Sequence, residues 1–352
     1  MPFEKLAEMI LPREVIGGHG AVEKVGDVFK KLTSSNRGVV VTGNTTKTLA
    51  GERGKGILET AGIETSIIQV DYATEENVER VKEHTKNFGA RVLIGVGGGT
   101  KIDIAKKSAF DLGLDFISVP TSASHDGVAS PRATISKNGL SSSVEAMMPA
   151  ALIADTEIIV TAPFRFLAAG AADVLSNLPA LKDWNLGHKL KGERVSSSAY
   201  AISEFAAREI ISNASQIKPQ VEESVWLVIK QIVFSGIAMS IAGNSRPASG
   251  SEHMFAHAVD SMKKGNGLHG ELCGIGSIIA MYLHGADWVQ VRSTLQTIGA
   301  PTTLAQVSLT EDDAIEALMM AHKTRPDRYT ILGESGISET AAREALNITG
   351  VS

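Results

Sequence analysis

The chain has 352 residues, of which 43% are hydrophobic and 21% charged, a composition typical of a globular protein large enough for two domains. Its 34 basic and 39 acidic side chains give a net charge of −5 without any basic run, which argues against nucleic acid as a partner. The single cysteine, Cys273, excludes an internal disulfide and a cysteine-rich zinc finger. Because it stands in an apolar run, we expect it to be a small buried side chain.

The sequence also lacks the features of an exported or membrane-spanning protein. No uninterrupted apolar stretch reaches the roughly 20 residues that a spanning helix needs. The first residues, "MPFEKLAEMILPREV", carry acids where a signal peptide would carry bases. We therefore expect a cytoplasmic protein without membrane insertion.

The first part of the chain alternates between two patterns. Short apolar runs at 37–44, 65–71, 90–99, 114–122 and 150–155 have the character of buried strands, and the segments at 46–62, 74–89 and 100–113 have helical spacing. Runs that are apolar throughout suit parallel strands covered by helices on both faces. This alternation predicts a doubly wound, Rossmann-like α/β domain over residues 1–158.

From about residue 160 the pattern becomes helical throughout. Segments such as "FRFLAAGAADVLSNLPALKDW" and "EESVWLVIKQIVFSGIAMSIA" are rich in alanine and large aliphatic residues at helical spacing. Pro163 precedes the first of them and favours a helix start there. We predict an all-helical second domain over residues 159–352, which holds the metal and the substrate.

A glycine triplet follows the third of these strands, in "VLIGVGGGTKIDIAKK". Gly97, Gly98 and Gly99 let the backbone approach a pyrophosphate, and the N-terminus of the next helix favours anions. Thr100 is placed to cap that helix. Neither the G-x-G-x-x-G pattern nor a Walker loop is met, so a tight strand-to-helix turn remains the alternative.

A serine-rich loop, "PTSASHDGVASP", follows the next strand and should emerge at the same edge of the sheet, where open α/β folds bind ligands. Its hydroxyl groups could contact a phosphate or ribose, and Asp126 could accept hydrogen bonds from a polyol. The alternative is a solvated turn, since these residues form turns readily. The loop residues concerned are Thr121, Ser122, Ser124, His125, Asp126 and Ser130.

Three histidines fall between residues 250 and 271. His253 and His257 are four apart and share a face of a helix predicted over 251–264, and His269 follows a glycine-rich turn. Glu252 is expected to face elsewhere, and Met254 stands where a zincin motif needs glutamate, so a metalloprotease is not indicated. Asp173 lies in a small, apolar helical stretch, where an unpaired charge is costly unless a cation compensates it. The alternative is ordinary core or surface histidines, with Asp173 as a helix cap.

With these residues the chain resembles the iron-dependent alcohol dehydrogenase and glycerol dehydrogenase superfamily, and within it the archaeal-type sn-glycerol-1-phosphate dehydrogenases. The motifs behind this likeness are "GVGGGTKIDIAK", "PTSASHDGVASP", "GAADVLSN" and "SRPASGSEHMFAH" followed by "GLHGE". The resemblance implies the dehydroquinate synthase-like fold of iron-containing alcohol dehydrogenases. It also implies reversible reduction of dihydroxyacetone phosphate to sn-glycerol 1-phosphate, which supplies the backbone of archaeal ether-linked phospholipids.

The same resemblance assigns roles to individual residues. Asp173, His253 and His269 match three ligands of one Zn²⁺ per subunit, and His257 matches a histidine beside the metal that contacts substrate. Asp126 matches a substrate-binding acid. Asn177 stands where many iron enzymes have a further histidine, which favours a three-ligand zinc site. The residues matched to the NAD(H) or NADP(H) site are Gly97, Gly98, Gly99, Thr100, Lys101, Asp103, Thr121, Ser122, Ser124 and Ser130.

The sequence offers one candidate for the substrate phosphate and leaves the choice of cofactor open. Arg246 is the candidate for the substrate phosphate because guanidinium suits bidentate contact, the alternative being a surface arginine. Strand 37–42 ends without an acid that would repel a 2′-phosphate, so we expect both NAD and NADP to be used. A homo-oligomer is expected. The rival functions are a glycerol dehydrogenase acting on unphosphorylated substrate, a dehydroquinate synthase-like lyase, and a non-catalytic dinucleotide-binding protein.

Overall fold

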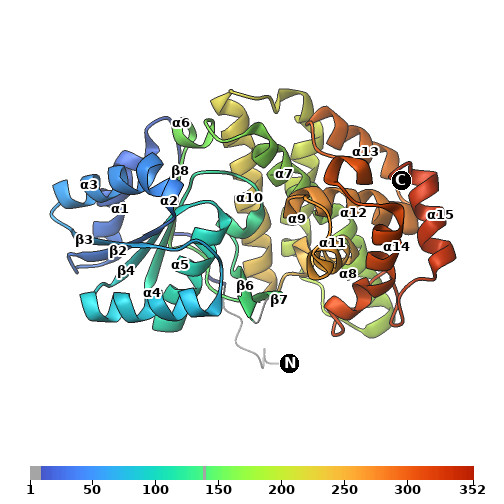
Figure 1. Cartoon of the computed structure of the whole chain (residues 1–352), viewed down its shortest axis with the longest axis horizontal. Coiled ribbons are helices and arrows are strands. Elements are labelled where there is room, and N and C mark those ends of the chain that lie inside the picture. The colour runs from blue at the N-terminus through green and yellow to red at the C-terminus, as the bar shows by residue number, and fades with distance from the viewer. Residues whose placement is uncertain (1–8, 138–139) are drawn as a thin grey trace.

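A computed structural model describes residues 9–137 and 140–352, and its first part is built on a six-stranded sheet (Figure 1). The strand order is β1-β8-β5-β4-β2-β3, and each neighbouring pair is parallel. The strands are β1 (Glu14–Gly18), β2 (Arg37–Thr42), β3 (Glu64–Gln69), β4 (Val92–Gly97), β5 (Asp115–Pro120) and β8 (Ala151–Asp155). Every strand expected from the sequence is present.

Helices cover both faces of this sheet, because successive side chains of its buried strands point to opposite sides. Val40 packs in one apolar cluster with Phe29 and Leu58, whereas Val39 belongs to another cluster with Ile102. The doubly wound α/β prediction is therefore confirmed. The helices of this part are α1 (Val25–Leu32), α2 (Asn44–Thr46), α3 (Glu52–Thr60), α4 (Glu75–Phe88) and α5 (Gly99–Leu112).

Two features of this part were not expected from the sequence. β1 adds an edge strand beside β8, and β6 (Arg132–Lys137) pairs antiparallel with β7 (Leu140–Glu145) in a separate two-stranded sheet. The β6–β7 segment is rich in serine, so its strands lack the apolar signal of the central sheet. The sequence Asn138-Gly139 between them is nevertheless a known hairpin signal that could have located the pair.

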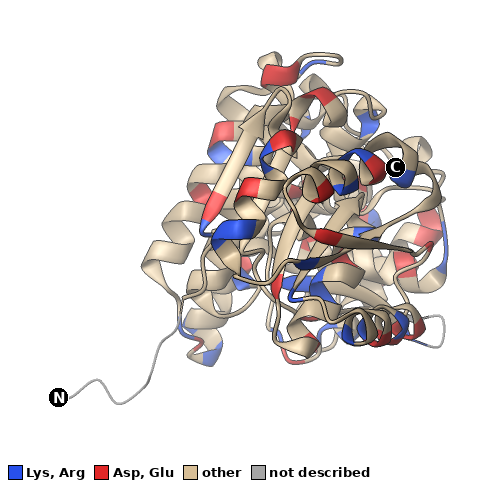
Figure 2. Ribbon diagram, turned by 90° about the vertical axis from the view of Figure 1, so that its left-hand side faces the viewer, with Lys and Arg blue, Asp and Glu red and all other residues tan. Residues whose placement is uncertain are grey.

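The second part is helical throughout, and α7 begins directly after Pro163 as expected. α6 (Thr156–Ile159) crosses the boundary placed at 158/159, so the exact division into domains remains a prediction. The helices that follow are α7 (Phe164–Leu175), α8 (Asn177–Lys191), α9 (Ser197–Ser212), α10 (Glu222–Ala242), α11 (Ser251–Met262), α12 (His269–Leu283), α13 (Trp288–Thr297), α14 (Glu311–Met320) and α15 (Glu339–Thr349). Acidic and basic residues are interspersed along both parts (Figure 2).

α10 is long and apolar enough to cross a membrane by length and composition alone. It packs against α7 and α9 and also contacts β1, which is the position of a core helix that joins the two parts of the chain. Most of its apolar window is buried in the protein. Its hydropathy therefore has a sufficient explanation in this packing.

The serine-rich loop after β5 is seated between helices of the second part. A Cβ at Gly170 of α7 would lie 2.0 Å from the carbonyl oxygen of Ala123, and one at Gly236 of α10 would lie 2.0 Å from that of Ala129. Only glycine at these two positions lets the loop backbone approach so closely. The loop is thus held where the α/β part meets the helices.

Candidate metal centre and active site

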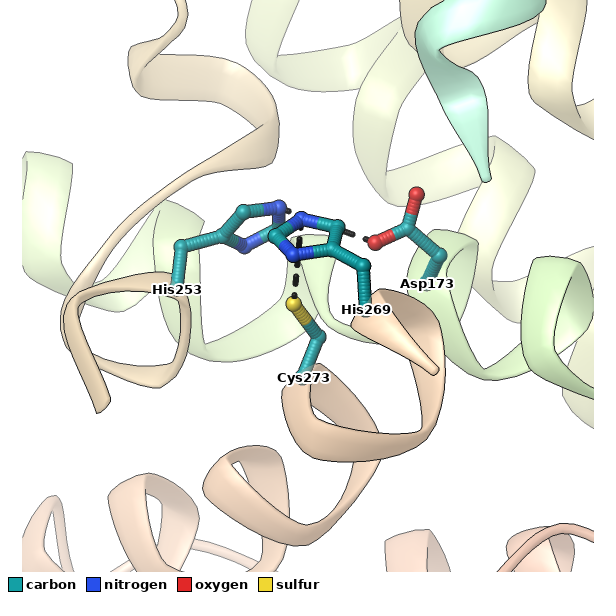
Figure 3. Close-up of side chains that lie close together, drawn as sticks. All are labelled: Asp173, His253, His269 and Cys273. Carbon is teal, nitrogen blue, oxygen red and sulfur yellow. Dashed lines mark hydrogen bonds and ion pairs between the residues drawn. The ribbon is translucent and has the colours of Figure 1, made fainter. Parts of the chain in front are cut away.

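Four side chains from three helical segments point toward one another in the second part of the chain (Figure 3). Asp173 comes from α7, His253 from α11, and His269 and Cys273 from the first turns of α12. One potential ligand atom from each lies within 4.8 Å of the others. Nε2 of His253 is 3.6 Å from Oδ1 of Asp173. The structure therefore brings together the three residues predicted as metal ligands.

The surroundings of Asp173 favour a bound cation. Its side chain is buried, and Oδ2 accepts a hydrogen bond of 2.8 Å from the backbone N–H of Asp126. Among the described residues, Oδ1 has no hydrogen-bond partner. A buried carboxylate oxygen without a partner is costly, and a divalent ion between Asp173 and the two imidazoles would satisfy it. One oxygen and two nitrogen donors fit zinc or a similar ion.

The protonation states of the cluster point the same way. Burial raises the pKa of Asp173 to about 6, and burial together with Asp173 raises the pKa of Asp126 to about 7. Burial also lowers the pKa of His257 to about 3 and that of His253 well below its ordinary value. The imidazoles of His253 and His257 are thus neutral, and the neutral form is the one that binds metal. A bound cation would lower the pKa of Asp173 and Asp126 again.

Glu252 orients the first histidine of the cluster, so the expectation that it faces elsewhere is wrong. It is fully buried, and its Oε1 lies 2.9 Å from Nδ1 of His253 and accepts from the N–H of Gly250 at 2.6 Å. A carboxylate on Nδ1 leaves Nε2 free to face the Asp173 carboxyl. Neighbouring residues on a helix differ by about 100° in direction, but a glutamate side chain is long enough to fold back.

Cys273 is buried as expected, but its thiol lies in the cluster rather than in a purely apolar setting. Sγ is 3.6 Å from Nε2 of His269, one turn earlier on α12. The four-residue spacing between these two residues was the available signal. His257 also lies beside the cluster, with its ring centroid 5.4 Å from that of His269. Asn177 is outside the cluster, and its Nδ2 donates to the carbonyl oxygen of Ser203.

The glycine loop lies at the carboxyl end of β4, where α5 begins. Gly97 has φ +155°, which favours glycine, and a Cβ at Gly99 would lie 2.0 Å from Nε2 of His125, so the His125 ring packs directly against this glycine. The residue that caps α5 is Gly98, and Thr100 lies inside the helix, so the expected threonine cap is not present. The N–H of Thr121 donates to the carbonyl oxygen of Gly97, which ties the serine-rich loop to the glycine loop.

The remaining predicted cofactor residues lie around these two loops. The Nζ of Lys101 donates to the carbonyl oxygen of Asp71 at 3.3 Å. Asp103 is buried and accepts from the N–H of Thr134. Ser122 and Ser130 are buried, whereas Ser124 is partly exposed. Ser122 also lies close to Gly98, since a Cβ there would be 3.4 Å from its Oγ.

Two adjoining cavities connect the glycine loop with the histidines. One has a volume of about 460 Å³ and is lined by Gly99, Thr100 and Asp103 on one side and by His257 and His269 on the other. The second, smaller cavity is also lined by Asp103, His257 and His269. It reaches His253 and Asp126 as well. A larger hollow of about 780 Å³, beside Phe110 and Met147, contains none of the predicted site residues.

Arg246 is neither a surface arginine nor part of these cavities. Its guanidinium is buried and donates to both carboxylate oxygens of Glu193 at 2.6 and 2.7 Å, and to the carbonyl oxygen of Tyr329. The arginines that do line the smaller cavity are Arg132 and Arg325. Arg132 directly follows the serine-rich motif, but no sequence pattern marks Arg325.

Comparison with known proteins places this geometry in a family. Residues 16–163 match the family model described as iron-containing alcohol dehydrogenase. A curated protein of Thermoplasma volcanium named "Glycerol-1-phosphate dehydrogenase [NAD(P)+]" is 49% identical over 100% of both chains. One of the same name from Methanosarcina barkeri is 50% identical over 97% of this chain and 96% of its own. The chain belongs to the glycerol-1-phosphate dehydrogenase family.

Solved structures confirm the fold of this family member. A probable glycerol dehydrogenase from Sinorhizobium meliloti superimposes with a TM-score of 0.79 at 20% identity, over 97% of this chain and 98% of its own. NADH-dependent butanol dehydrogenase A from Thermotoga maritima gives a TM-score of 0.75 at 17% identity, over 98% of each chain. At such identities the likeness concerns the fold alone. The predicted iron-containing alcohol dehydrogenase fold is confirmed.

Proposed function

We propose that this chain is an NAD(P)H-dependent and zinc-dependent glycerol-1-phosphate dehydrogenase. It reduces dihydroxyacetone phosphate reversibly to sn-glycerol 1-phosphate, a backbone for ether-linked phospholipids. The observation behind the proposal is the cluster of buried Asp173 and His253 with partly exposed His269, beside a cavity that starts at the glycine loop. The full-length relatives named glycerol-1-phosphate dehydrogenase [NAD(P)+] support the choice of reaction.

The three residues of the cluster would hold one zinc ion per subunit, and that ion would supply a Lewis acid for the C2 carbonyl of the substrate. Asp173 supplies the only carboxylate among the three predicted ligands, and Glu252 keeps Nε2 of His253 turned toward it. Asn177 is engaged elsewhere, which supports a site with three protein ligands.

The cofactor is proposed to lie along the larger cavity, with its nicotinamide toward the histidines. Gly97, Gly98, Gly99, Thr100 and Lys101, at the N-terminus of α5, would bind the pyrophosphate through backbone N–H groups. The supporting hydroxyl groups are those of Thr121, Ser122, Ser124 and Ser130. Asp103 lines the same cavity and pairs with Lys106, which donates to the serine-rich loop. No acid that would repel a 2′-phosphate follows β2 directly, so both NAD(H) and NADP(H) are proposed.

Two further side chains act on the substrate in this proposal. Asp126 hydrogen-bonds a substrate hydroxyl, and His257 beside the cluster relays the proton of the C2 hydroxyl. His257 lines both cavities, so it stands between the proposed cofactor and substrate. We further propose a homo-oligomer that acts in the cytoplasm, where its cofactor and substrate are made.

The test is nicotinamide oxidation by the purified, metal-analysed protein with dihydroxyacetone phosphate and dihydroxyacetone in parallel, using NADH and NADPH. The proposal requires zinc near one ion per chain and a much higher kcat/KM for the phosphate ester. Preference for dihydroxyacetone would make the protein a glycerol dehydrogenase. Inactivity on both substrates would favour the dehydroquinate synthase-like lyase.

A further inference from the structure

Two arginines line the same small cavity as the histidines but come from opposite parts of the molecule. Arg132 begins β6 of the two-stranded sheet, and Arg325 directly follows the short helix Ala321–Thr324. Both are partly buried. Arg132 donates from Nε and from one terminal nitrogen to Ser143, at 3.2 and 2.7 Å. The Arg325 guanidinium makes no hydrogen bond or ion pair within residues 9–137 and 140–352.

Both cations line this one cavity, and in the described part of the chain no carboxylate is bound to either. Burial lowers the pKa of both, and the charge of Arg325 lowers the pKa of Arg132 further. The charge of Arg325 also acts to lower the pKa of His257. The charge of Glu145 raises the pKa of Arg132, and that of Asp327 raises the pKa of Arg325, which offsets part of this lowering. Such an arrangement stabilises an anion that enters between the two guanidinium groups.

The neighbouring arginines are already engaged. Arg328 donates to the carbonyl oxygen of Ser249 and to Oγ of Ser245, and so supports the loop that forms one wall of the cavity. Arg246 is paired with Glu193. The unused donors that face the cavity therefore belong to Arg132 and Arg325. The serine side chains of this wall add neutral hydrogen-bond donors.

We propose that Arg132 and Arg325 form the phosphate subsite of the substrate and thereby set the preference for a phosphorylated triose. The inference rests on the proposed function. The cavity of about 60 Å³ has room for about five water molecules, which matches the five non-hydrogen atoms of a phosphate group. Arg132 belongs to the α/β part and Arg325 to the helical part, so the phosphate is bound from both sides. A triose without phosphate leaves the two cations of this cavity without an anionic partner.

The test uses Arg325→Ala, Arg132→Ala and the matching Arg→Lys variants, with Arg91→Ala as control. Arg91 is exposed at the amino end of β4 and does not line the small cavity. Each alanine variant should raise KM for dihydroxyacetone phosphate about 30-fold or more. Its kcat/KM for dihydroxyacetone should stay within about threefold of wild type, because that substrate has no phosphate for the arginines to bind. Lysine should restore part of the loss, and thermal melting should show that the variants fold.

A second readout is binding of inorganic phosphate by calorimetry, which does not depend on turnover. Binding to the wild-type protein that is lost in both alanine variants supports the subsite. If the wild-type protein reduces dihydroxyacetone phosphate but the variants bind phosphate equally well, the subsite assignment is wrong and the proposed function stands. If the wild-type protein prefers dihydroxyacetone and binds no phosphate, both are wrong. Equal losses on both substrates would indicate a structural role for the arginines and would also overturn the assignment.

Discussion

Lys106 is the side chain whose removal should most disturb the position of the serine-rich loop. It is fully buried on α5, and its Nζ donates to the carbonyl oxygens of Gly127 at 2.6 Å, Ser130 at 3.2 Å and Arg132. It also lies 3.2 Å from Oδ1 of Asp103. One ammonium group thus compensates a buried carboxylate and three carbonyl oxygens at once.

Lys106→Met keeps a side chain as long as the aliphatic part of lysine but leaves the Asp103 charge uncompensated. Removing one partner of a buried ion pair costs about 3–5 kcal/mol, a large share of the roughly 5–15 kcal/mol by which native proteins are stable. We expect a loss of that size in the free energy of unfolding, measured by urea denaturation at pH 7. Lys106→Met/Asp103→Asn should be more stable than Lys106→Met alone, because no charge is then left without a partner.

The matched control is Lys107→Met, one residue further along α5. Lys107 is partly exposed and pairs with Asp111, which is also partly exposed, so its loss should cost less than about 1 kcal/mol. A cost below about 1 kcal/mol for Lys106→Met, or no recovery in the double variant, would refute the reasoning that this lysine holds the loop.

Three further predictions concern packing, titration and the metal. Gly170→Ala would force a Cβ against a loop carbonyl and should lower the free energy of unfolding by about 1–3 kcal/mol or more. The control Gly54→Ala, in α3 with open space around it, should raise the free energy of unfolding by up to about 1 kcal/mol in the same urea assay. Equal effects of the two substitutions would contradict the close packing at Gly170. A hydrogen bond to Glu222 raises the pKa of His19 above 6.5. The stability from this pair is therefore full below pH 6.5 and is lost as pH rises through the higher pKa of the folded state. In Glu222→Gln, NMR titration should find the pKa of His19 back at its ordinary value. Asp173→Ala should bind zinc at least about 100-fold more weakly, and metal analysis that found full zinc content after dialysis would exclude Asp173 as a ligand.

The sequence predicted those strands and helices whose burial shows in the local pattern of apolar residues. Runs such as "VLIGV" are apolar on every residue and follow a helical segment, so their place in a parallel sheet could be inferred. β6 and β7 are half-exposed and rich in serine, and β1 is a short edge strand with a mixed burial pattern. Such strands are defined by what they pair with, which the local pattern does not contain.

The candidate site divides in the same way. Asp173, His253 and His269 could be grouped through the motifs around them, although their roles stay predictions. Glu252 was misjudged because helical direction alone ignores the reach of its side chain. Arg325 comes from a segment without any motif, and only tertiary packing brings it to the histidine cavity.

The measurement that tests the central claim most directly is the stereochemistry of the product. Dihydroxyacetone phosphate would be reduced to completion, and the product passed to a coupled assay specific for sn-glycerol 3-phosphate. Full consumption of the nicotinamide cofactor with no signal in that assay is the predicted result and would establish the sn-1 product. A stoichiometric signal would show the opposite enantiomer and contradict the proposed function.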